Sequence, residues 1–207
     1  AENNPGIVVI AGFHPHQADS VTRDDIGALA ELVRHEKVVA IGEIGLDFYR
    51  NLSSREAQIQ RFREQIQLAR EISLPIIIHD RQAHQEVVKI LQEEKAETIG
   101  GVIHCFSGDW RMAKACLEMG FFISIPGTVT FRNSGDYQTL VRDIPTERLL
   151  LETDSPFLTP APFRGKRNEP ANVRYVAKAV ARIKGMDVAE LGGITTRNAQ
   201  KLFNLPL

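Results

Sequence analysis

The stretch "PIIIHDRQAHQEVVKILQEE", residues 75–94, decides the fold of this chain. Its β-branched run, Pro75–Ile78, predicts a buried strand, and the apolar spacing over Arg81–Glu94 predicts an amphipathic helix. The same strand-then-helix unit recurs along the chain without the turn signals of β-hairpins. This alternation predicts parallel strands joined by right-handed crossovers, in either a doubly wound sheet or a (β/α) barrel.

The pattern gives bounds for each expected element. The expected strands are Ile7–Ala11, Val38–Ile41, Pro75–Ile78, Gly101–Ile103, Phe121–Ile125 and Leu149–Leu151. The expected helices are roughly Arg23–His35, Ser54–Ile72, Arg81–Glu94, Asp109–Met119, Tyr137–Ile144, Ala171–Lys184 and Asp187–Leu202. Thr22, and either Ser53 or Ser54, are expected helix N-caps because acidic residues follow them closely.

Composition narrows the class of protein. A chain of 207 residues predicts a single domain over residues 1–207 with a sizeable core. The net charge of -1 excludes a protein that coats nucleic acid through bulk charge, so any such binding is confined to one cleft or loop. The two cysteines, Cys105 and Cys116, form no CxxC pair and indicate a reducing, cytoplasmic location. No apolar stretch reaches membrane-spanning length.

Acidic residues and histidines follow four of the expected strands. Glu43, His79 and His104 each come at the end of a strand, and Glu152-Thr153-Asp154 follows another. The carboxyl ends of parallel strands open on one face, where active sites form. Mixed imidazole and carboxylate ligands suit Zn, Mn or Mg hydrolytic sites. The sequence therefore predicts a metal site at this edge of the sheet.

Strand alternation separates ligands from their neighbours. If the His104 side chain points into the mouth of a barrel, that of Cys105 points toward the helices and packs there. Glu152 and Asp154 are two residues apart and share a face. Asp154 lies nearer the mouth and is the better ligand or base, whereas Glu152 is expected below it as a supporting residue.

Several motifs, in chain order, resemble the TatD family of metal-dependent deoxyribonucleases. They are "GFHPHQA" (12–18), "AIGEIGLDFYR" (40–50), "PIIIHDRQA" (75–83), "GVIHCFSGD" (101–109), "LLLETDSPFLTPAPFRGKRNEPANV" (149–173) and "TTRNAQKLFNL" (195–205). The resemblance covers nearly the whole chain. It implies an amidohydrolase-like (β/α)8 barrel of the TIM type, with a two-metal phosphodiesterase site. The implied metal ligands are Glu43, as a bridging carboxylate, and His79, His104 and Asp154.

The His-x-His pair in "GFHPH" is not expected to bind metal. In the resembling family the His-x-His metal pair lies in a D-x-H-x-H motif on the first strand, whereas "GFHPH" matches a motif of the third. Pro15 also bends the chain where a ligand strand would stay extended. By resemblance, His14 contacts the substrate phosphate and His16 braces the loop. The first two strands, with their ligands, are therefore expected to be missing before Ala1, which leaves about six of eight βα units and two open sheet edges.

The loop after Asp154 is basic. "FRGKRNEP" (163–170) contains Arg164, Lys166 and Arg167, cations that suit a phosphodiester beside a metal site. Asn168 is expected to cap the helix that follows. By resemblance, the Arg164 position binds substrate.

Further residues are expected at the rim of the site. Arg81 lies two residues past His79, and Asp47 lies four past Glu43, so both are candidate substrate contacts. Phe48 and Tyr49 would either stack on a base or pack against the fold.

Together these features predict metal-assisted phosphodiester hydrolysis by a monomer acting on single-stranded DNA, as a 3′-5′ exonuclease. Two divalent ions (Mg, Mn or Zn), bridged by Glu43, would activate a shared water that Asp154 orients or deprotonates. Arg164 and His14 would stabilise the charge that develops on the phosphate. One alternative is an amidohydrolase acting on another ester or amide, such as a D-aminoacyl-tRNA. Another is a catalytically inactive binding module, since the His-x-His ligands are absent.

Overall fold

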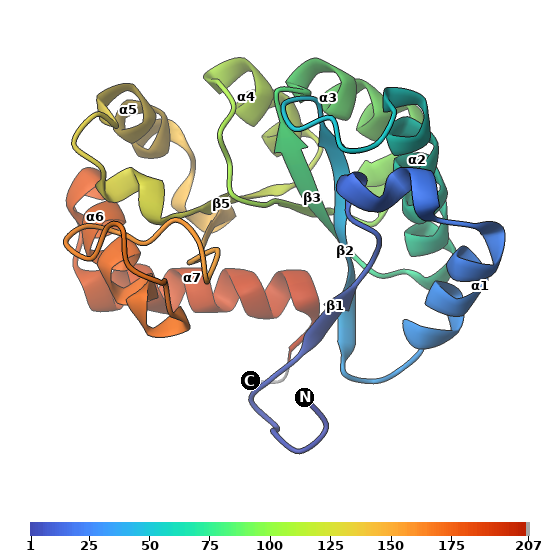
Figure 1. Cartoon of the computed structure of the whole chain (residues 1–207). Coiled ribbons are helices and arrows are strands. Elements are labelled where there is room, and N and C mark those ends of the chain that lie inside the picture. The colour runs from blue at the N-terminus through green and yellow to red at the C-terminus, as the bar shows by residue number, and fades with distance from the viewer. Residues whose placement is uncertain (206–207) are drawn as a thin grey trace.

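The computed structural model describes residues 1–205, which form one curved parallel sheet with helices along its outer side (Figure 1). The strand order is β1-β2-β3-β4-β5-β6. The strands are β1 (Val9–Ala11), β2 (Val38–Asp47), β3 (Ile76–Arg81), β4 (Gly101–Ile103), β5 (Phe122–Ile125) and β6 (Leu149–Leu151). The helices are α1 (Arg23–Leu32), α2 (Arg55–Ile72), α3 (His84–Glu93), α4 (Trp110–Glu118), α5 (Gly135–Asp143), α6 (Val173–Lys184) and α7 (Val188–Phe203).

The expected α/β class with parallel strands is confirmed, and each expected strand is present. Thr22 and Ser54 cap α1 and α2, as predicted. Asn168 does not cap α6, because the cap position is Asn172. Asn168 is instead 2% exposed and donates from Nδ2 to the backbone oxygens of Thr153 and Phe157.

Strands β2 and β3 are longer than the sequence predicts. They stay paired through Gly45 opposite His79 and Asp47 opposite Arg81, so Glu43 and His79 lie within strands rather than after them. Glycine is needed at position 45, since its φ is 140° and an added Cβ would lie 2.0 Å from the His79 carbonyl oxygen. The apolar run alone does not reveal this extension, because glycines and charged residues interrupt it in β2 and only polar residues follow it in β3.

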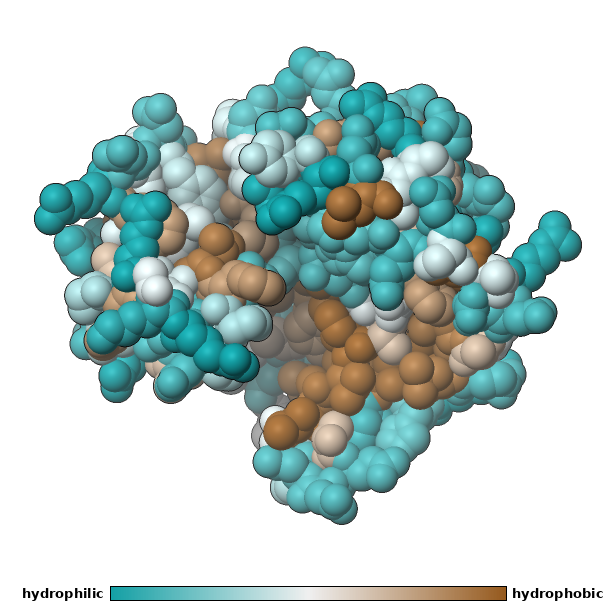
Figure 2. Space-filling model, in the orientation of Figure 1, coloured by the Kyte–Doolittle hydropathy of each residue, from teal (hydrophilic) through white to brown (hydrophobic). Residues whose placement is uncertain are grey.

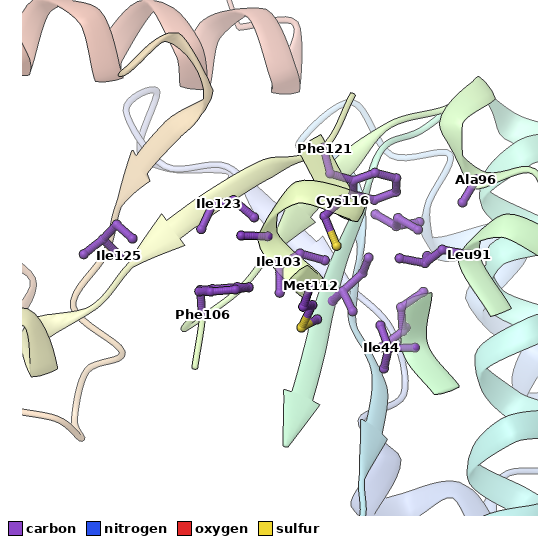
Figure 3. Close-up of a cluster of buried hydrophobic side chains, with 14 of the residues drawn as sticks. Ile44, Leu91, Ala96, Ile103, Phe106, Met112, Cys116, Phe121, Ile123 and Ile125 are labelled. Atoms are coloured by element: carbon purple, nitrogen blue, oxygen red, sulfur yellow. The ribbon is translucent and has the colours of Figure 1, made fainter. Parts of the chain in front are cut away.

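The two faces of the sheet bury different apolar clusters. The convex face packs against α2, α3 and α4 through residues such as Ile44, Ile103, Ile123 and Leu91 (Figure 3). The concave face carries a smaller cluster that packs against α7. Its members are Val102, Phe122 and Leu150, with Ile77, Ala199, Leu202 and Phe203 against them. Helix α7 therefore covers part of the concave side, at the end of the sheet away from the loops that follow β2 and β3 (Figure 1).

The two ends of the sheet, β1 and β6, are not paired with each other in the described part of the chain. Next to β1, the run Ile7–Ile10 is 37–48% exposed, and it forms part of the brown surface in Figure 2. Two open edges were expected, and both are seen among residues 1–205. Among residues 1–205, no helix is both long and apolar enough to cross a membrane.

Candidate active site

The polar side chains of the candidate site lie on the concave side of the sheet. Ile77, Val102 and Leu150 belong to the concave cluster. Side chains alternate between the two faces along a strand, so residues two apart share a face. His79 therefore lies on the same face as Ile77, and His104 on the same face as Val102. Glu152 and Asp154 follow Leu150 likewise. With Glu43 on β2, four strands thus bring carboxylates and imidazoles to one place.

Glu43 lies at the centre of this group. Its Oε1 atom is 2.6 Å from His79 Nδ1 and 3.8 Å from His14 Nε2. Its Oε2 atom is 3.9 Å from His104 Nε2. One carboxylate therefore faces histidines from three different segments, and its side chain is 26% exposed.

His104 is held from behind by Glu152. Its Nδ1 atom lies 2.9 Å from Glu152 Oε2, which also accepts the backbone N–H of Cys105 at 3.1 Å. The Nε2 atom of His104 then points to Asp154 Oδ1, 3.4 Å away. Glu152 thus lies behind His104, a position that suits the supporting role expected for it.

Asp47 lines the cavity of the site, as expected, but only 1% of its surface is exposed. Its Oδ1 accepts the backbone N–H groups of Tyr49 and Arg50 at 3.0 and 2.7 Å. Its Oδ2 lies 2.7 Å from His16 Nε2 and 3.2 Å from His79 Nε2. Because both oxygens are occupied, Asp47 orients the two histidines, and its role in binding substrate stays a prediction.

The charges of the site perturb its pKa values. Burial alone would lower the pKa of His104, but Asp154 and Glu152 raise it to about 11. Burial would raise the pKa of Glu43, but the hydrogen bond with His79 and the charge of His104 hold it below its ordinary value. Burial and nearby His79 lower the pKa of His14 to about 4, so this imidazole is neutral at pH 7. The centre is therefore rich in negative charge that a cation would balance.

A second group of possible metal donors comprises His14, His16 and His79. One donor atom from each lies within 4.8 Å of the others. Two of these histidines were expected to serve the substrate and the loop. Their nitrogen atoms are largely engaged already: His14 Nδ1 accepts the His16 N–H at 3.2 Å, and His16 Nε2 contacts Asp47. His79 belongs to both groups, and its two ring nitrogens likewise contact Glu43 and Asp47, so the ligand set around Glu43 stays a prediction.

The site opens into a cavity of about 890 Å³. Arg81 lines it, with its guanidinium 4.3 Å from the centre of the Tyr49 ring. Arg164 does not reach this cavity. It lines an adjoining pocket of about 470 Å³ with Arg132, and its guanidinium lies 4.2 Å over the Phe131 ring. The two spaces share Thr128 in their walls.

Comparison with known proteins identifies the family. The family model "TatD related DNase" matches residues 1–204. The chain belongs to the TatD family. A *Bacillus subtilis* relative, the metal-dependent hydrolase YabD, is 50% identical over 96% of this chain and 78% of its own. The 3′-5′ ssDNA/RNA exonuclease TatD of *Erwinia tasmaniensis* is 40% identical over 94% and 77%.

The fold agrees with a solved member of the TatD family. The crystal structure of YjjV, a TatD homologue from *Escherichia coli* K12, superposes with a TM-score of 0.92 at 29% identity. The match covers 99% of this chain and 80% of YjjV. Of the doubly wound sheet and the (β/α) barrel left open by the sequence pattern, this likeness decides for the barrel.

Membership in the TatD family implies divalent metal, and the donor set fits it. Two carboxylates and two imidazoles, from Glu43, Asp154, His79 and His104, are ligands that Zn, Mn and Mg accept. Glu43 presents its two oxygens to different histidines, as a bridging carboxylate does. Glu152 contacts Nδ1 of His104, so the Nε2 atom of His104 faces the site. Histidines that bind metal are typically held in this way.

Some cavity residues carried no signal in the sequence. Leu52, Phe157 and Thr128 line the same cavity as Glu43. Their type predicts packing, and only the segments after β2, β5 and β6 bring them to the site. The two aromatic residues that the sequence singled out lie elsewhere: Phe48 packs against the core, and the Tyr49 ring is covered by Arg81.

Proposed function

We propose that this chain hydrolyses phosphodiester bonds with bound divalent metal ions, and that it shortens single-stranded DNA from the 3′ end. The observation that carries the proposal is the position of Glu43 between His79 and the His104–Asp154 pair. The name of the *Erwinia* relative, a 3′-5′ ssDNA/RNA exonuclease, supports the choice of substrate.

The side chains around Glu43 divide the work. Metal ions held by Glu43, His79, His104 and Asp154 would supply Lewis acidity and a more acidic bound water. Asp154 is 28% exposed and faces the cavity, so it can accept a proton from an attacking water. Glu152 keeps His104 in one orientation throughout.

The substrate phosphate would meet His14 and Arg81. His14 is neutral at pH 7 and lines the cavity, so it can donate a hydrogen bond without repelling a metal. Arg81 lines the same cavity and supplies positive charge to the phosphate oxygens. Arg164 and Arg132, in the adjoining pocket, would contact a phosphate further along the strand, which favours a polynucleotide over a single nucleotide.

The test is a cleavage assay on a 5′-labelled single-stranded oligonucleotide. The chain is stripped with chelator and reloaded with Mn, Mg or Zn, and a small carboxylic ester is assayed in parallel. We expect 3′ shortening that stops with chelator and returns with metal. The Asp154→Asn variant, prepared identically, controls for contaminating nuclease.

Two outcomes would contradict the proposal. Cleavage of the ester but not of DNA would favour an amidohydrolase. Binding of metal without turnover of either substrate would favour an inactive binding module.

A further inference from the structure

Phe157 is an unusually exposed aromatic residue at the mouth of the site. With 68% of its surface accessible, it leads the exposed large hydrophobic side chains of residues 1–205. It lines the same cavity as Glu43, His104 and Asp154. Figure 2 shows apolar surface at the left margin of the hollow, over the loop that follows β6. Exposed apolar surface inside a catalytic cleft indicates a contact that the substrate completes.

The loop that carries Phe157 is fixed. The Phe157 N–H donates to the Asp154 backbone oxygen at 2.8 Å, and its own oxygen accepts Nδ2 of the buried Asn168 at 2.7 Å. The following residue packs tightly too, since a Cβ on Gly127 would lie 2.3 Å from the Leu158 oxygen. Exposure of the ring therefore does not come from a loose loop, and a ligand that stacks on it would pay little ordering entropy.

Other aromatic rings near the site already have partners. Tyr49 lies under Arg81 at 4.3 Å, and Phe131 lies under Arg164 at 4.2 Å. Phe163 packs against Tyr175, with ring centres 5.2 Å apart. In the described part of the chain, Phe157 has no such ring or cation partner, so its face is available.

We propose that Phe157 is a stacking platform for one nucleobase of the substrate, close to the scissile phosphate. Leu52, 63% exposed and lining the same cavity, adds an apolar contact from the loop after β2. The cavity has this apolar margin beside its carboxylates and imidazoles. A nucleotide matches this arrangement, because it joins a flat base to a phosphate. The proposal rests on the proposed function and deepens it, because a base can stack on Phe157 only when it is unpaired. Phe157 would thus select single-stranded ends.

The experiment measures how cleavage depends on a base at each position. Single-stranded oligonucleotides carry an abasic residue at one of the three positions nearest the 3′ end, and each is compared with the intact strand. For the unaltered protein we expect one position at which loss of the base lowers kcat/KM about 5- to 150-fold. Phe157→Ala should cleave the intact strand as slowly as that abasic strand, and Phe157→Trp should keep the preference.

Leu32→Ala is the matched control, since Leu32 is 56% exposed on α1 and does not line the cavity. It should leave every rate unchanged. If Phe157→Ala keeps the base preference of the unaltered protein, Phe157 is not the platform, although the nuclease function stands. If the unaltered protein cleaves no oligonucleotide with any metal, the proposed nuclease function itself is wrong. This outcome differs from a failure of the Phe157 proposal alone, in which cleavage is seen.

Discussion

The two halves of the site are built differently. Around β1, β2 and β3, side chains are joined by short contacts, with Glu43 2.6 Å from His79 and Asp47 2.7 Å from His16. Around β4 and β6 the contacts into the site are longer: His104 lies 3.4 Å from Asp154 and 3.9 Å from Glu43. The first half is joined by short hydrogen bonds, whereas in the second half His104 is linked to Glu43 and Asp154 only by longer contacts.

The backbone explains this difference. Glu43, Asp47 and His79 lie within long paired strands, so the ladder fixes their positions. His104 and Asp154 follow strands of three residues and lie on loops. Asp154 has a φ of 57°, a left-handed conformation that Asp and Asn tolerate better than most residues. We infer that the strand-held half sets the frame and the loop-held half supplies the proton acceptor, Asp154.

The largest expected effect is on the loop-held half. Asp154→Asn should lower turnover of single-stranded DNA about 10²- to 10⁴-fold, because the amide cannot accept the proton from water. Asn keeps the tolerance for a positive φ, so the melting temperature should stay within a few degrees. Asp143→Asn, an exposed change at the end of α5, is the control. Undiminished turnover in Asp154→Asn would contradict both the role of Asp154 and the division between the halves.

A smaller loss of metal affinity or turnover is expected for Glu152, which lies behind His104. Glu152→Gln removes the charge that holds His104 from its Nδ1 side, and metal affinity or turnover should fall about 10- to 100-fold. Metal titration followed by calorimetry separates a binding defect from a catalytic one. Glu147→Gln, exposed just before β6, should change neither quantity. If Glu152→Gln bound metal normally and turned over at full rate, His104 would not depend on this contact.

In the strand-held half the expected loss is mainly of stability. Asp47→Asn replaces a buried charged acceptor of two backbone N–H groups and two imidazoles. The free energy of unfolding should fall by about 1 to 2 kcal/mol, measured by urea denaturation against Asp143→Asn. A loss of turnover with unchanged stability would show that Asp47 acts on the substrate after all, and would remove the distinction between the halves.

Much of this arrangement was predictable from the chain. The apolar runs predicted each strand, and the polar residue types after them predicted the grouping of Glu43, His79, His104 and Asp154 at one edge. Parity along the last strand predicted Glu152 below Asp154 as a supporting residue; its contact with His104 is seen only in the structure. These inferences depend only on local periodicity and on the common direction of parallel strands.

Other features depend on contacts that no local pattern encodes. Asp47 has the type of a rim residue, yet its burial is set by pairing of β2 with β3 and by His16 from a distant segment. Asn168 has the type of a helix cap, but the loop after β6 turns its side chain inward. The Arg164 guanidinium lies over the Phe131 ring and so does not reach the cavity that Glu43 lines. In each case tertiary packing overrides residue type.

The smallest expected effect lies on the convex side of β3, behind the strand-held half. The hydrogen bond with Asp80 raises the pKa of His84 above 6.5. A raised folded-state pKa stabilises the fold fully below pH 6.5, and this contribution is lost as the pH rises through the higher value. Against His84→Gln, the unaltered protein should be more stable by about 1 kcal/mol or less at pH 5.5, since solvent screens a side chain that is about one third exposed. The difference should shrink toward alkaline pH. A difference that grew with pH would reverse the sign of this linkage. It would also mean that the strand-held half draws its stability from a neutral His84.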